Sequence, residues 1–358
     1  MASVSLTGKA VIVSGLKSRP ELNFLCGVAE KLDDTSGRFA VRLPVLSKPI
    51  LLKPDNLEAA PDAVAAIAAC CEAEHAAEVK ERVRAASAGE SHEDTNDCVL
   101  DLDTVGLQEL PMVVGTLSEM RELWLAGNAL SALPPSIGSL VRLRSLDLDG
   151  NRLSSLPASI GSLTALETLY CNNNALVSVP EAIGSLRALR ELRLNGNLIG
   201  AKGVSLGALP EAMGRLEALR TLWLAANRLD EVPAMVLELA HLEELDLADN
   251  ELVALPKALS KLKGLASLEL TSNPKLVWPP PDVAAQGAAA VRTWLANAED
   301  REPPVDLDAN IIPLAGTQWG TGVPLYAHEP EGSMHMPLPQ VSPDGHGGGE
   351  FIFPATSR

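Results

Sequence analysis

The sequence predicts an α/β solenoid of short stacked coils, preceded by a small all-β barrel and followed by a disordered tail. Three observations support the solenoid. Asparagine recurs at intervals of 23 residues, with one interval of 30. The residues around each asparagine also recur, and the composition is 46% hydrophobic with only 3% aromatic residues. Such internal repetition is typical of arrays in which each unit buries its apolar side chains only against its neighbours. The asparagines are Asn128, Asn151, Asn174, Asn197, Asn227, Asn250 and Asn273.

One half of each repeat predicts a short strand. In the segment Leu146-Asp-Leu148-Asp-Gly-Asn151, two leucines alternate with an aspartate, so both leucines face one side of a strand and the aspartate faces the other. The asparagine side chain has both donors and an acceptor. We therefore expect a ladder in which each Asn bonds backbone groups of its own coil and of the neighbouring coil.

The other half of each repeat predicts a return segment on the opposite side. In Leu156-Pro157-Ala-Ser-Ile160-Gly161-Ser-Leu163, proline fixes the backbone, Ile160 and Leu163 point inward, and Gly161 permits a close approach of neighbouring coils. The repeat that contains Asn197 is seven residues longer. For this repeat we expect a wider helical return segment of the ribonuclease-inhibitor type, with a binding protrusion as the alternative.

The complete unit, Leu-x-x-Leu-x-Leu-x-x-Asn-x-Leu-x-x-Leu-Pro-x-x-Ile-Gly-x-Leu, resembles the plant intracellular Ras-group-related leucine-rich-repeat proteins and their animal Ras-scaffold relatives. The resemblance implies a leucine-rich-repeat horseshoe over residues 98–281, with about eight repeats. It also implies a class of function: holding small GTPases, kinases or phosphatases in intracellular signalling complexes. The matched residues are structural, so the resemblance assigns no binding residue.

Flanking segments divide the rest of the chain. Residues 59–97 predict an Ala-rich helical linker that caps the first coil, and residues 282–300 predict a capping helix with apolar residues at three- and four-residue spacing. Residues 1–58 contain short strands separated by turn residues and resemble a Src-homology-3-like module found beside MYND fingers in algal and protist proteins. Phe24 stands where that module usually has Gly. Residues 301–358 are rich in Pro, Gly and His, and predict disorder.

Charge and cysteine content exclude several classes of function. The net charge of -17 argues against a nucleic-acid partner, which would require clustered Lys and Arg. The five cysteines are scattered, without the pairing of a disulfide framework or the spacing of a zinc site. No apolar run is long enough for a membrane span. We expect a cytoplasmic monomer, with the nucleus and the plastid as open alternatives.

The sequence predicts no enzyme. It contains no Gly-x-x-x-x-Gly-Lys-Ser/Thr loop, no His-Glu-x-x-His pair and no Gly-x-Ser-x-Gly elbow. We expect no catalytic residue, no cofactor and no metal site.

The residue between the two strand leucines of each repeat should point out from the concave face. Aromatic residues and arginine at such positions are typical of binding hot spots. The column reads Asp101, Trp124, Asp147, Tyr170, Arg193, Trp223, Asp246 and Glu269.

With the flanking acids the concave face would hold ten carboxylates against Arg193 alone. The flanking acids are Asp103, Glu122, Asp149, Glu191, Glu244 and Asp249. We therefore predict a protein partner with a basic and apolar patch. Its binding residues would be Trp124, Asp147, Asp149, Tyr170, Arg193, Trp223 and Asp246. Two alternatives stay open: a structural subunit of a larger complex, and a nucleic-acid or chromatin adaptor that acts through the N-terminal barrel.

Overall fold

The computed structural model describes residues 6–7, 9–33, 35–60, 62–71, 75–88, 98–200 and 209–298. Most of the extra length in the repeat of Asn197, and the tail over 301–358, lie outside these residues. Within the described residues the strands form an eight-stranded sheet and a five-stranded sheet. Each sheet contributes to a hydrophobic core of its own.

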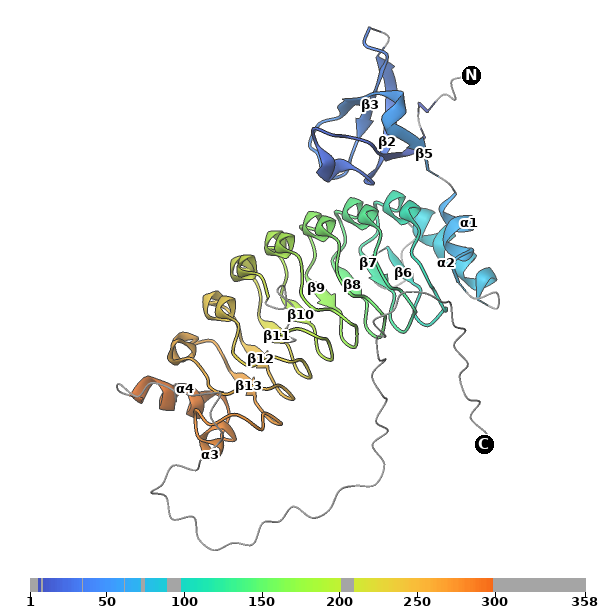
Figure 1. Cartoon of the computed structure of the whole chain (residues 1–358). Coiled ribbons are helices and arrows are strands. Elements are labelled where there is room, and N and C mark those ends of the chain that lie inside the picture. Colours follow the sequence, from blue (N-terminus) through green and yellow to red (C-terminus); the bar gives the residue numbers. More distant parts are fainter. Residues whose placement is uncertain are drawn as a thin grey trace, which may run out of the picture. The chain divides into compact units, whose positions relative to one another are not determined.

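The eight-stranded sheet is parallel and takes its strands in chain order, so every strand pairs with the strand of the next coil (Figure 1). Each strand is three residues long, with a buried leucine in the middle. Leu146 and Leu148 are fully buried, as the alternation predicts. The strands are β6 (Val99–Asp101), β7 (Glu122–Trp124), β8 (Ser145–Asp147), β9 (Thr168–Tyr170), β10 (Glu191–Arg193), β11 (Thr221–Trp223), β12 (Glu244–Asp246) and β13 (Ser267–Glu269).

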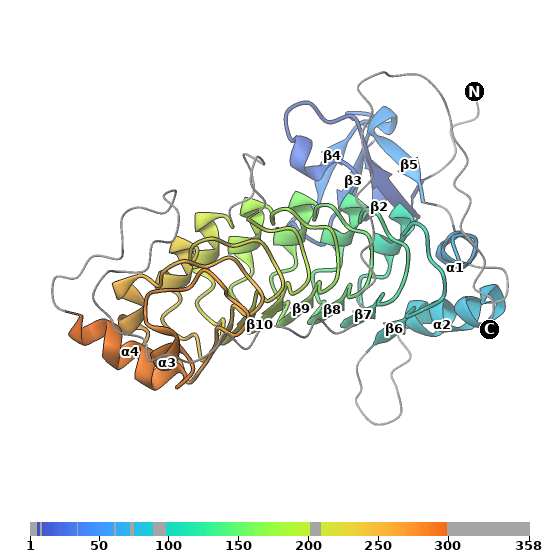
Figure 2. The ribbon, with the colours of Figure 1, turned by 60° about the horizontal axis from the view of Figure 1, so that its bottom comes forward.

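The return side consists of short 3-10 helices, which line the side of the solenoid opposite the strands (Figure 2). A proline precedes each helix, and Ile160 and Leu163 are fully buried. Gly161 passes so close to the next coil that a Cβ there would lie 2.5 Å from the Ala182 carbonyl oxygen. The helices are η3 (Met112–Thr116), η4 (Pro135–Ser139), η5 (Ala158–Ser162), η6 (Glu181–Ser185), η7 (Glu211–Arg215), η8 (Ala234–Glu238) and η9 (Lys257–Lys261).

The repeating asparagines bond one coil to the next. The Nδ2 of Asn151 donates to the Leu125 carbonyl of the preceding coil at 2.8 Å and to the Leu148 carbonyl of its own coil at 3.1 Å. Its Oδ1 accepts the Leu130 amide at 3.0 Å. The other six asparagines make the same three kinds of bond. Backbone groups where the chain leaves the strand are thereby satisfied without water.

The N-terminal side of the solenoid carries two helices where the sequence predicts one. α1 (Ala63–Ala68) packs on η3, and α2 (Ala76–Ala88) packs on β6. Because the two helices cover different parts of the first coil, one straight helix would not reach both. Cys70 and Cys71 follow the end of α1 instead of lying on a helix, and both thiols are half-buried.

The C-terminal side is likewise closed by two helices, α3 (Pro281–Ala284) and α4 (Ala288–Asn297), where the sequence predicts one over 282–300. Gly287 separates them with a φ of 84°, a left-handed conformation that interrupts a helix. α4 packs on η9 and β13, and buries Val291 and Leu295. The Trp294 ring meets Trp278 edge to face at 4.5 Å.

The N-terminal residues form an antiparallel five-stranded sheet in the order β4-β3-β2-β1-β5. The strands are β1 (Ala10–Val13), β2 (Cys26–Asp33), β3 (Arg38–Arg42), β4 (Ile50–Leu52) and β5 (Leu57–Ala59), with 3-10 helices η1 (Pro20–Leu22) and η2 (Pro54–Asn56) between them. The sequence predicts strands over 9–13, 27–30, 38–43 and 50–53, which overlap β1 to β4, but it does not predict β5, because Leu57-Glu-Ala is too short to show alternation. The Cys26 amide donates to the Ser139 hydroxyl of the solenoid at 2.9 Å.

Phe24 occupies a backbone position that suits glycine. Its φ is 67°, and its side chain is 45% exposed. The preceding Asn23 fixes this turn, because its Oδ1 accepts the Leu16 amide and its Nδ2 donates to the Leu16 carbonyl. The turn therefore holds Phe24 in a left-handed conformation that only glycine adopts without strain.

We expect Phe24→Gly to raise the free energy of unfolding by about 0.5–1 kcal/mol, since relief of left-handed strain exceeds the entropic cost of glycine. Urea unfolding would measure the change. Leu51→Gly is the matched control: Leu51 is also exposed, but it lies in a regular strand, so glycine there should destabilise. A lower stability of Phe24→Gly would contradict the strain argument.

Candidate functional site

The third residues of strands β6 to β13 form one continuous row across the sheet. Asp101 pairs with Trp124, Trp124 with Asp147, and Asp147 with Tyr170. The row continues through Arg193, Trp223, Asp246 and Glu269 in the same register. Because the buried leucines on either side face inward, these side chains face outward, on the concave face of the strands. We call this set the concave row.

The centre of the concave row is a stack of three side chains. The Arg193 guanidinium carbon lies 4.3 Å from the Tyr170 ring centroid and 4.2 Å from the Trp223 ring centroid. Glu191 neutralises the arginine: its Oε1 accepts from Arg193 Nε at 2.6 Å and lies 2.5 Å from Nη2. The Tyr170 hydroxyl donates to the other Glu191 oxygen at 3.1 Å. Cation–π contact and ion pairing together hold this stack in one conformation.

Tyr170 keeps its proton in this setting. Burial, and then the nearby Glu191 carboxylate, raise the pKa of Tyr170 above its ordinary value. The hydroxyl therefore remains a donor at neutral pH and holds the Glu191 carboxylate in place.

Trp124 is more open than the stack. It is 36% exposed, which makes it one of the few exposed large hydrophobic residues among those the structure describes. Its row neighbours are two carboxylates, Asp101 and Asp147. An apolar ring flanked by acids is suited to contact a partner that carries both apolar and cationic groups.

The acids near Trp124 lie close enough to influence one another. Burial raises the pKa of Asp147, and the charges of Asp149 and Asp103 add to the rise. Burial also raises the pKa of Asp103, with Asp101 and Asp149 adding to it. This part of the surface thus concentrates negative charge at neutral pH.

Several of these acids also bond the backbone. Asp147 Oδ1 accepts the Asp149 amide at 2.9 Å, and Asp246 Oδ1 accepts the Ala248 amide at 3.0 Å. Asp149 accepts both the backbone amide and the side-chain amide of Asn172 in the next coil, at 2.6 and 2.9 Å. The row acids therefore have fixed orientations.

A second side-chain ladder runs beside the asparagine ladder. The Oδ1 of Asp149 accepts the backbone amide of Asn172. In the same way the Oδ1 of Asn172 accepts the backbone amide of Asn195, and the Oδ1 of Asn195 accepts that of Ala225. The sequence contains a signal for this ladder that the prediction above does not use. Asp or Asn recurs two residues after the member of the concave row in the same coil. Asp149 is accordingly a coil-to-coil contact as well as a surface acid.

Two expectations about charge are wrong. Asp249 does not lie beside Asp246 in the way that Asp149 lies beside Asp147, because Ala248 takes that place and Asp249 occupies a left-handed turn position with φ of 52°. Arg193 is also not the sole cation of this surface. Arg82 of α2 donates to the Asp101 carbonyl at 2.8 Å and lies 3.3 Å from its carboxylate.

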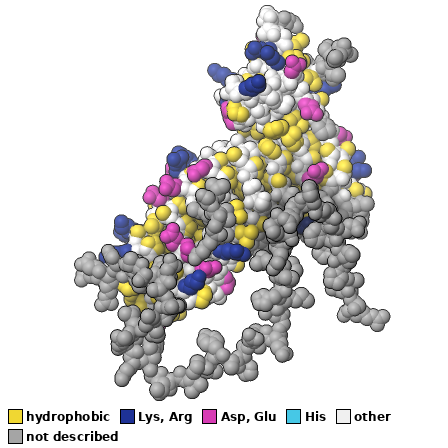
Figure 3. All heavy atoms as spheres, viewed as in Figure 1, with side chains coloured by type: hydrophobic (Ala, Val, Ile, Leu, Met, Phe, Trp, Pro, Cys, Tyr) yellow, Lys and Arg dark blue, Asp and Glu magenta, His cyan; other side chains and the backbone are white. Residues whose placement is uncertain are grey.

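A column of arginines and glutamates precedes the strands. The backbone amide of each member after the first donates to the backbone carbonyl of the member in the preceding coil. Some of the side chains also form ion pairs, Arg190 with Glu167 at 3.8 Å and Arg220 with Glu243. In the space-filling view, charged side chains of both signs are interspersed with hydrophobic ones along the solenoid (Figure 3). The column is Arg121, Arg144, Glu167, Arg190, Arg220 and Glu243.

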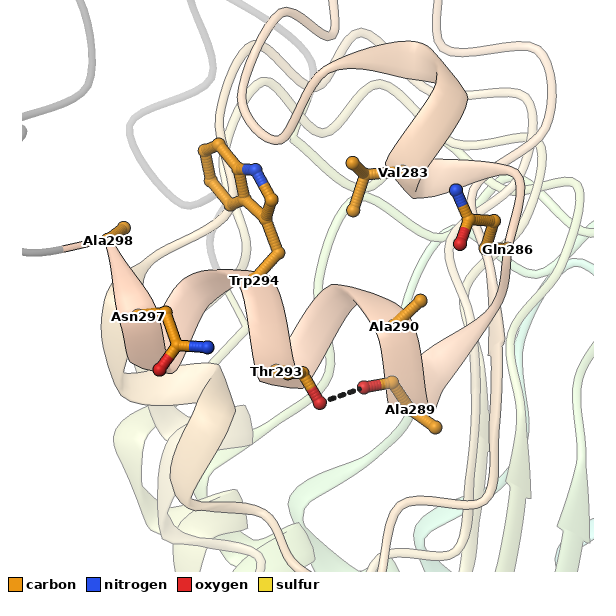
Figure 4. A pocket seen from close by; sticks show the side chains of 8 residues that line it. All are labelled: Val283, Gln286, Ala289, Ala290, Thr293, Trp294, Asn297 and Ala298. Carbon is orange, nitrogen blue, oxygen red and sulfur yellow. Dashed lines mark hydrogen bonds between the residues drawn. The ribbon is translucent and has the colours of Figure 1, made fainter.

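A hollow of about 830 Å³ lies at the C-terminal helices, away from the concave row. Its lining is mostly small or apolar, with Trp294 on one wall and Val283 on another (Figure 4). The Thr293 hydroxyl in this lining donates to the Ala289 carbonyl at 2.8 Å. No lining residue is an acid, a histidine or a cysteine, so the hollow places no base beside the Thr293 hydroxyl.

The described ranges contain no group of three or more His, Cys, Asp or Glu residues arranged to hold a metal. The thiols of Cys26, Cys70, Cys71 and Cys171 form no disulfide, and burial raises the pKa of Cys26 to about 12. No helix in the described part of the chain has the length and apolar character needed to cross a membrane.

Comparisons with known proteins agree with the repeat geometry. Residues 98–202 match the family described as leucine-rich repeat region, and residues 217–274 match the family described as leucine rich repeat. A comparison with curated proteins gives no match.

Solved structures that are similar include a leucine-rich-repeat protein of Leptospira interrogans, with 32% identity over 49% of this chain and a TM-score of 0.43. A plant peptide hormone receptor in complex with its peptide has 30% identity over 48% and a TM-score of 0.41. The ectodomain of the receptor kinase GASSHO1/SCHENGEN3 from Arabidopsis thaliana, in complex with Casparian strip integrity factor 2, has 30% identity over 48% and a TM-score of 0.37.

The match covers 52%, 32% and 24% of those three chains, respectively. The family matches, the parallel sheet of one strand per coil and the asparagine ladder describe the same segment. The repeat region of this protein is a leucine-rich-repeat solenoid.

Proposed function

We propose that this protein is a non-catalytic interaction scaffold that binds another protein on the concave face of its repeats. Leucine-rich-repeat proteins commonly mediate protein–protein interaction, and the concave face of a solenoid offers an extended surface for it. The observation that carries the proposal is the concave row, in which Tyr170, Arg193 and Trp223 face outward in adjacent coils and Trp124 lies one coil beyond Asp147.

The residue types and their order favour binding. Aromatic residues and arginine are enriched at interface hot spots, and the stack of Tyr170, Arg193 and Trp223 is already held in one conformation. A partner that contacts this stack loses little side-chain entropy on the scaffold's side.

Charge defines the kind of partner. Glu191 pairs with Arg193, and Asp101 pairs with Arg82, so the charge that the row presents comes from the carboxylates Asp147, Asp246 and Glu269. We therefore propose a partner with a basic patch around an apolar centre, bound by Trp124, Asp147, Asp149, Tyr170, Arg193, Trp223 and Asp246.

The wider role follows from the resemblance in the repeat unit. We place the scaffold in intracellular signalling, with a small GTPase, a kinase or a phosphatase as the class of partner. In this proposal the N-terminal five-stranded sheet is a Src-homology-3-like module that accompanies the solenoid.

Replacing Trp124, Tyr170 and Trp223 together by Ala should weaken partner binding at least 100-fold, because hot-spot aromatics each contribute about 2 kcal/mol or more. The leucine core is untouched, so the variant should remain folded. Affinity capture from extracts of the producing cells would compare proteins retained by the wild type and by the variant. Isothermal titration with each purified candidate would then measure affinity.

Arg187→Ala is the control. Arg187 lies on the return side in an exposed ion pair with Glu217, so its loss should not change retention. If every protein captured by the wild type is captured equally by the triple variant, with both variants folded by circular dichroism, the concave face is not the binding surface.

A further inference from the structure

The concave row alternates in its centre between aromatic and charged side chains. Trp124, Tyr170 and Trp223 occupy every second coil, and the residues between them are Asp147 and Arg193. Two successive aromatic residues are therefore separated by two strand spacings, about 9.6 Å, in both cases. Each intervening position lies between two aromatic residues, Asp147 between Trp124 and Tyr170 and Arg193 between Tyr170 and Trp223, but the two carry opposite charge.

The position of Arg193 shows what fits between two such rings. Its guanidinium lies at nearly equal distances, 4.3 and 4.2 Å, from the ring centroids on either side. The Glu191 carboxylate supplies the counter-charge at 2.5 Å. A planar cation between two π-faces with a carboxylate at its edge is a stable arrangement, and here the chain provides all of its parts.

The position of Asp147 likewise lies between two aromatic row residues, Trp124 and Tyr170, but carries a carboxylate in place of a cation. Trp124 is 36% exposed, and the described residues place no ring or guanidinium against it. Arg193 covers one face of the Tyr170 ring, which leaves the other face turned toward the coil of Asp147. Asp147 is short, and its Oδ1 accepts the Asp149 amide, so the carboxylate is fixed between the two rings.

The charges around Asp147 favour a cation. Asp149 follows it on the same strand end, and Asp103 acts on it from the first coil. The nearby cations are already paired: Arg193 with Glu191, and Arg82 with Glu78 and Asp101. Arg193 also acts on Asp147, but the carboxylates of Asp147, Asp149 and Asp103 outnumber it, so a cationic ligand at this position would meet net negative charge.

We propose that the position between Trp124 and Tyr170 binds the guanidinium of an arginine side chain from the partner protein, with Asp147 as its counter-ion. The proposal rests on the proposed function and specifies its chemistry. Binding completes a five-membered stack of Trp124, the partner's guanidinium, Tyr170, Arg193 and Trp223. A guanidinium suits the position better than an ammonium because it is planar and less strongly hydrated, so both of its faces can stack.

The test uses N-acetyl-arginine amide as the probe and the full chain labelled with 5-fluorotryptophan. The ¹⁹F signal of Trp124 is the one that Trp124→Leu removes. We expect this signal to shift saturably with the arginine compound. N-acetyl-lysine amide should bind at least fivefold more weakly. N-acetyl-citrulline amide, which has a similar shape without the charge, should bind at least tenfold more weakly.

Asp147→Arg provides the decisive variant. This variant places a guanidinium of the chain itself between Trp124 and Tyr170, just as Arg193 lies between Tyr170 and Trp223. Because the new side chain fills the site, it should abolish binding of the arginine compound. Asp282→Arg is the matched control: it makes the same change of charge at an exposed residue of α3, outside the concave row. This control should bind the probe within twofold of the wild type.

The proposal is overturned if the Trp124 signal of the wild type does not shift saturably, if citrulline binds as tightly as arginine, or if Asp147→Arg binds the probe as the wild type does. These outcomes are separate from failure of the proposed function. A protein lost from the triple-alanine variant would still establish the concave face as a binding surface without an arginine site. If the probe binds but no such protein is found, the arginine site is established and the proposed protein-binding function is not.

Discussion

Leu148→Asp is expected to unfold the coils around β8 and to lower the free energy of unfolding by more than about 4 kcal/mol. Leu148 is fully buried between the coils, where a carboxylate has no partner. Because each coil is stabilised by its neighbours, a coil that cannot bury its strand also removes the packing surface of the next one. The loss should therefore spread along the solenoid.

Urea unfolding followed by circular dichroism would show this as a much lower midpoint, or as a separate transition at low urea. Leu148→Met is the matched control, since it conserves volume and apolar character and should cost less than about 1.5 kcal/mol. A midpoint for Leu148→Asp close to that of the wild type would mean that this side chain reaches water, which the stacked-coil packing forbids.

Asn197→Ala is expected to lower the free energy of unfolding by about 2–4 kcal/mol, because it leaves buried backbone groups without partners. Asn197 is 4% exposed. Its Nδ2 donates to the carbonyls of Cys171 and Leu194, each at 2.9 Å, and its Oδ1 accepts the Leu176 amide at 2.9 Å. No water replaces these bonds inside the stack. Urea unfolding at neutral pH would measure the loss.

Asn197→Asp separates hydrogen bonding from shape. The carboxylate fits the same space and still accepts the Leu176 amide, but it cannot donate to the two carbonyls and meets their negative ends. We expect a loss at neutral pH at least as large as that of Asn197→Ala, and a partial recovery in acid, where a protonated carboxyl can donate again. Wild-type stability of both variants would show that the ladder is not required for stacking.

Much of the fold is visible in the sequence because the repeat makes it redundant. Seven asparagines at a fixed interval predict seven equivalent turns, and a strand side chain alternates between two faces. The concave row follows from these two facts alone, so Trp124, Asp147, Tyr170 and Trp223 are assigned to it before any coordinate is known. The register in the structure places them in neighbouring coils.

Expectations fail where the repeat ends or shifts by one residue. Asp249 is an aspartate like Asp149, but it stands three residues after its member of the concave row, whereas Asp149 stands two residues after. Asp249 therefore occupies a turn and not a place in the second ladder. The helices at both ends are broken, at Gly287 and after Ala68, because each must follow the surface of a terminal coil. No internal repeat exists to reveal that surface.

The sequence by itself determined the coil, its strand, its asparagine ladder and the list of side chains on the concave face, since all of these depend on periodicity along the chain. Only the tertiary structure decided which of those side chains interact. Arg193 lies between two rings and pairs with Glu191, Arg82 reaches Asp101 from α2, and Asp147 remains between two rings without a cation. The physical reason is that side-chain contacts depend on distances between coils and on rotamers, and neither is encoded in residue spacing.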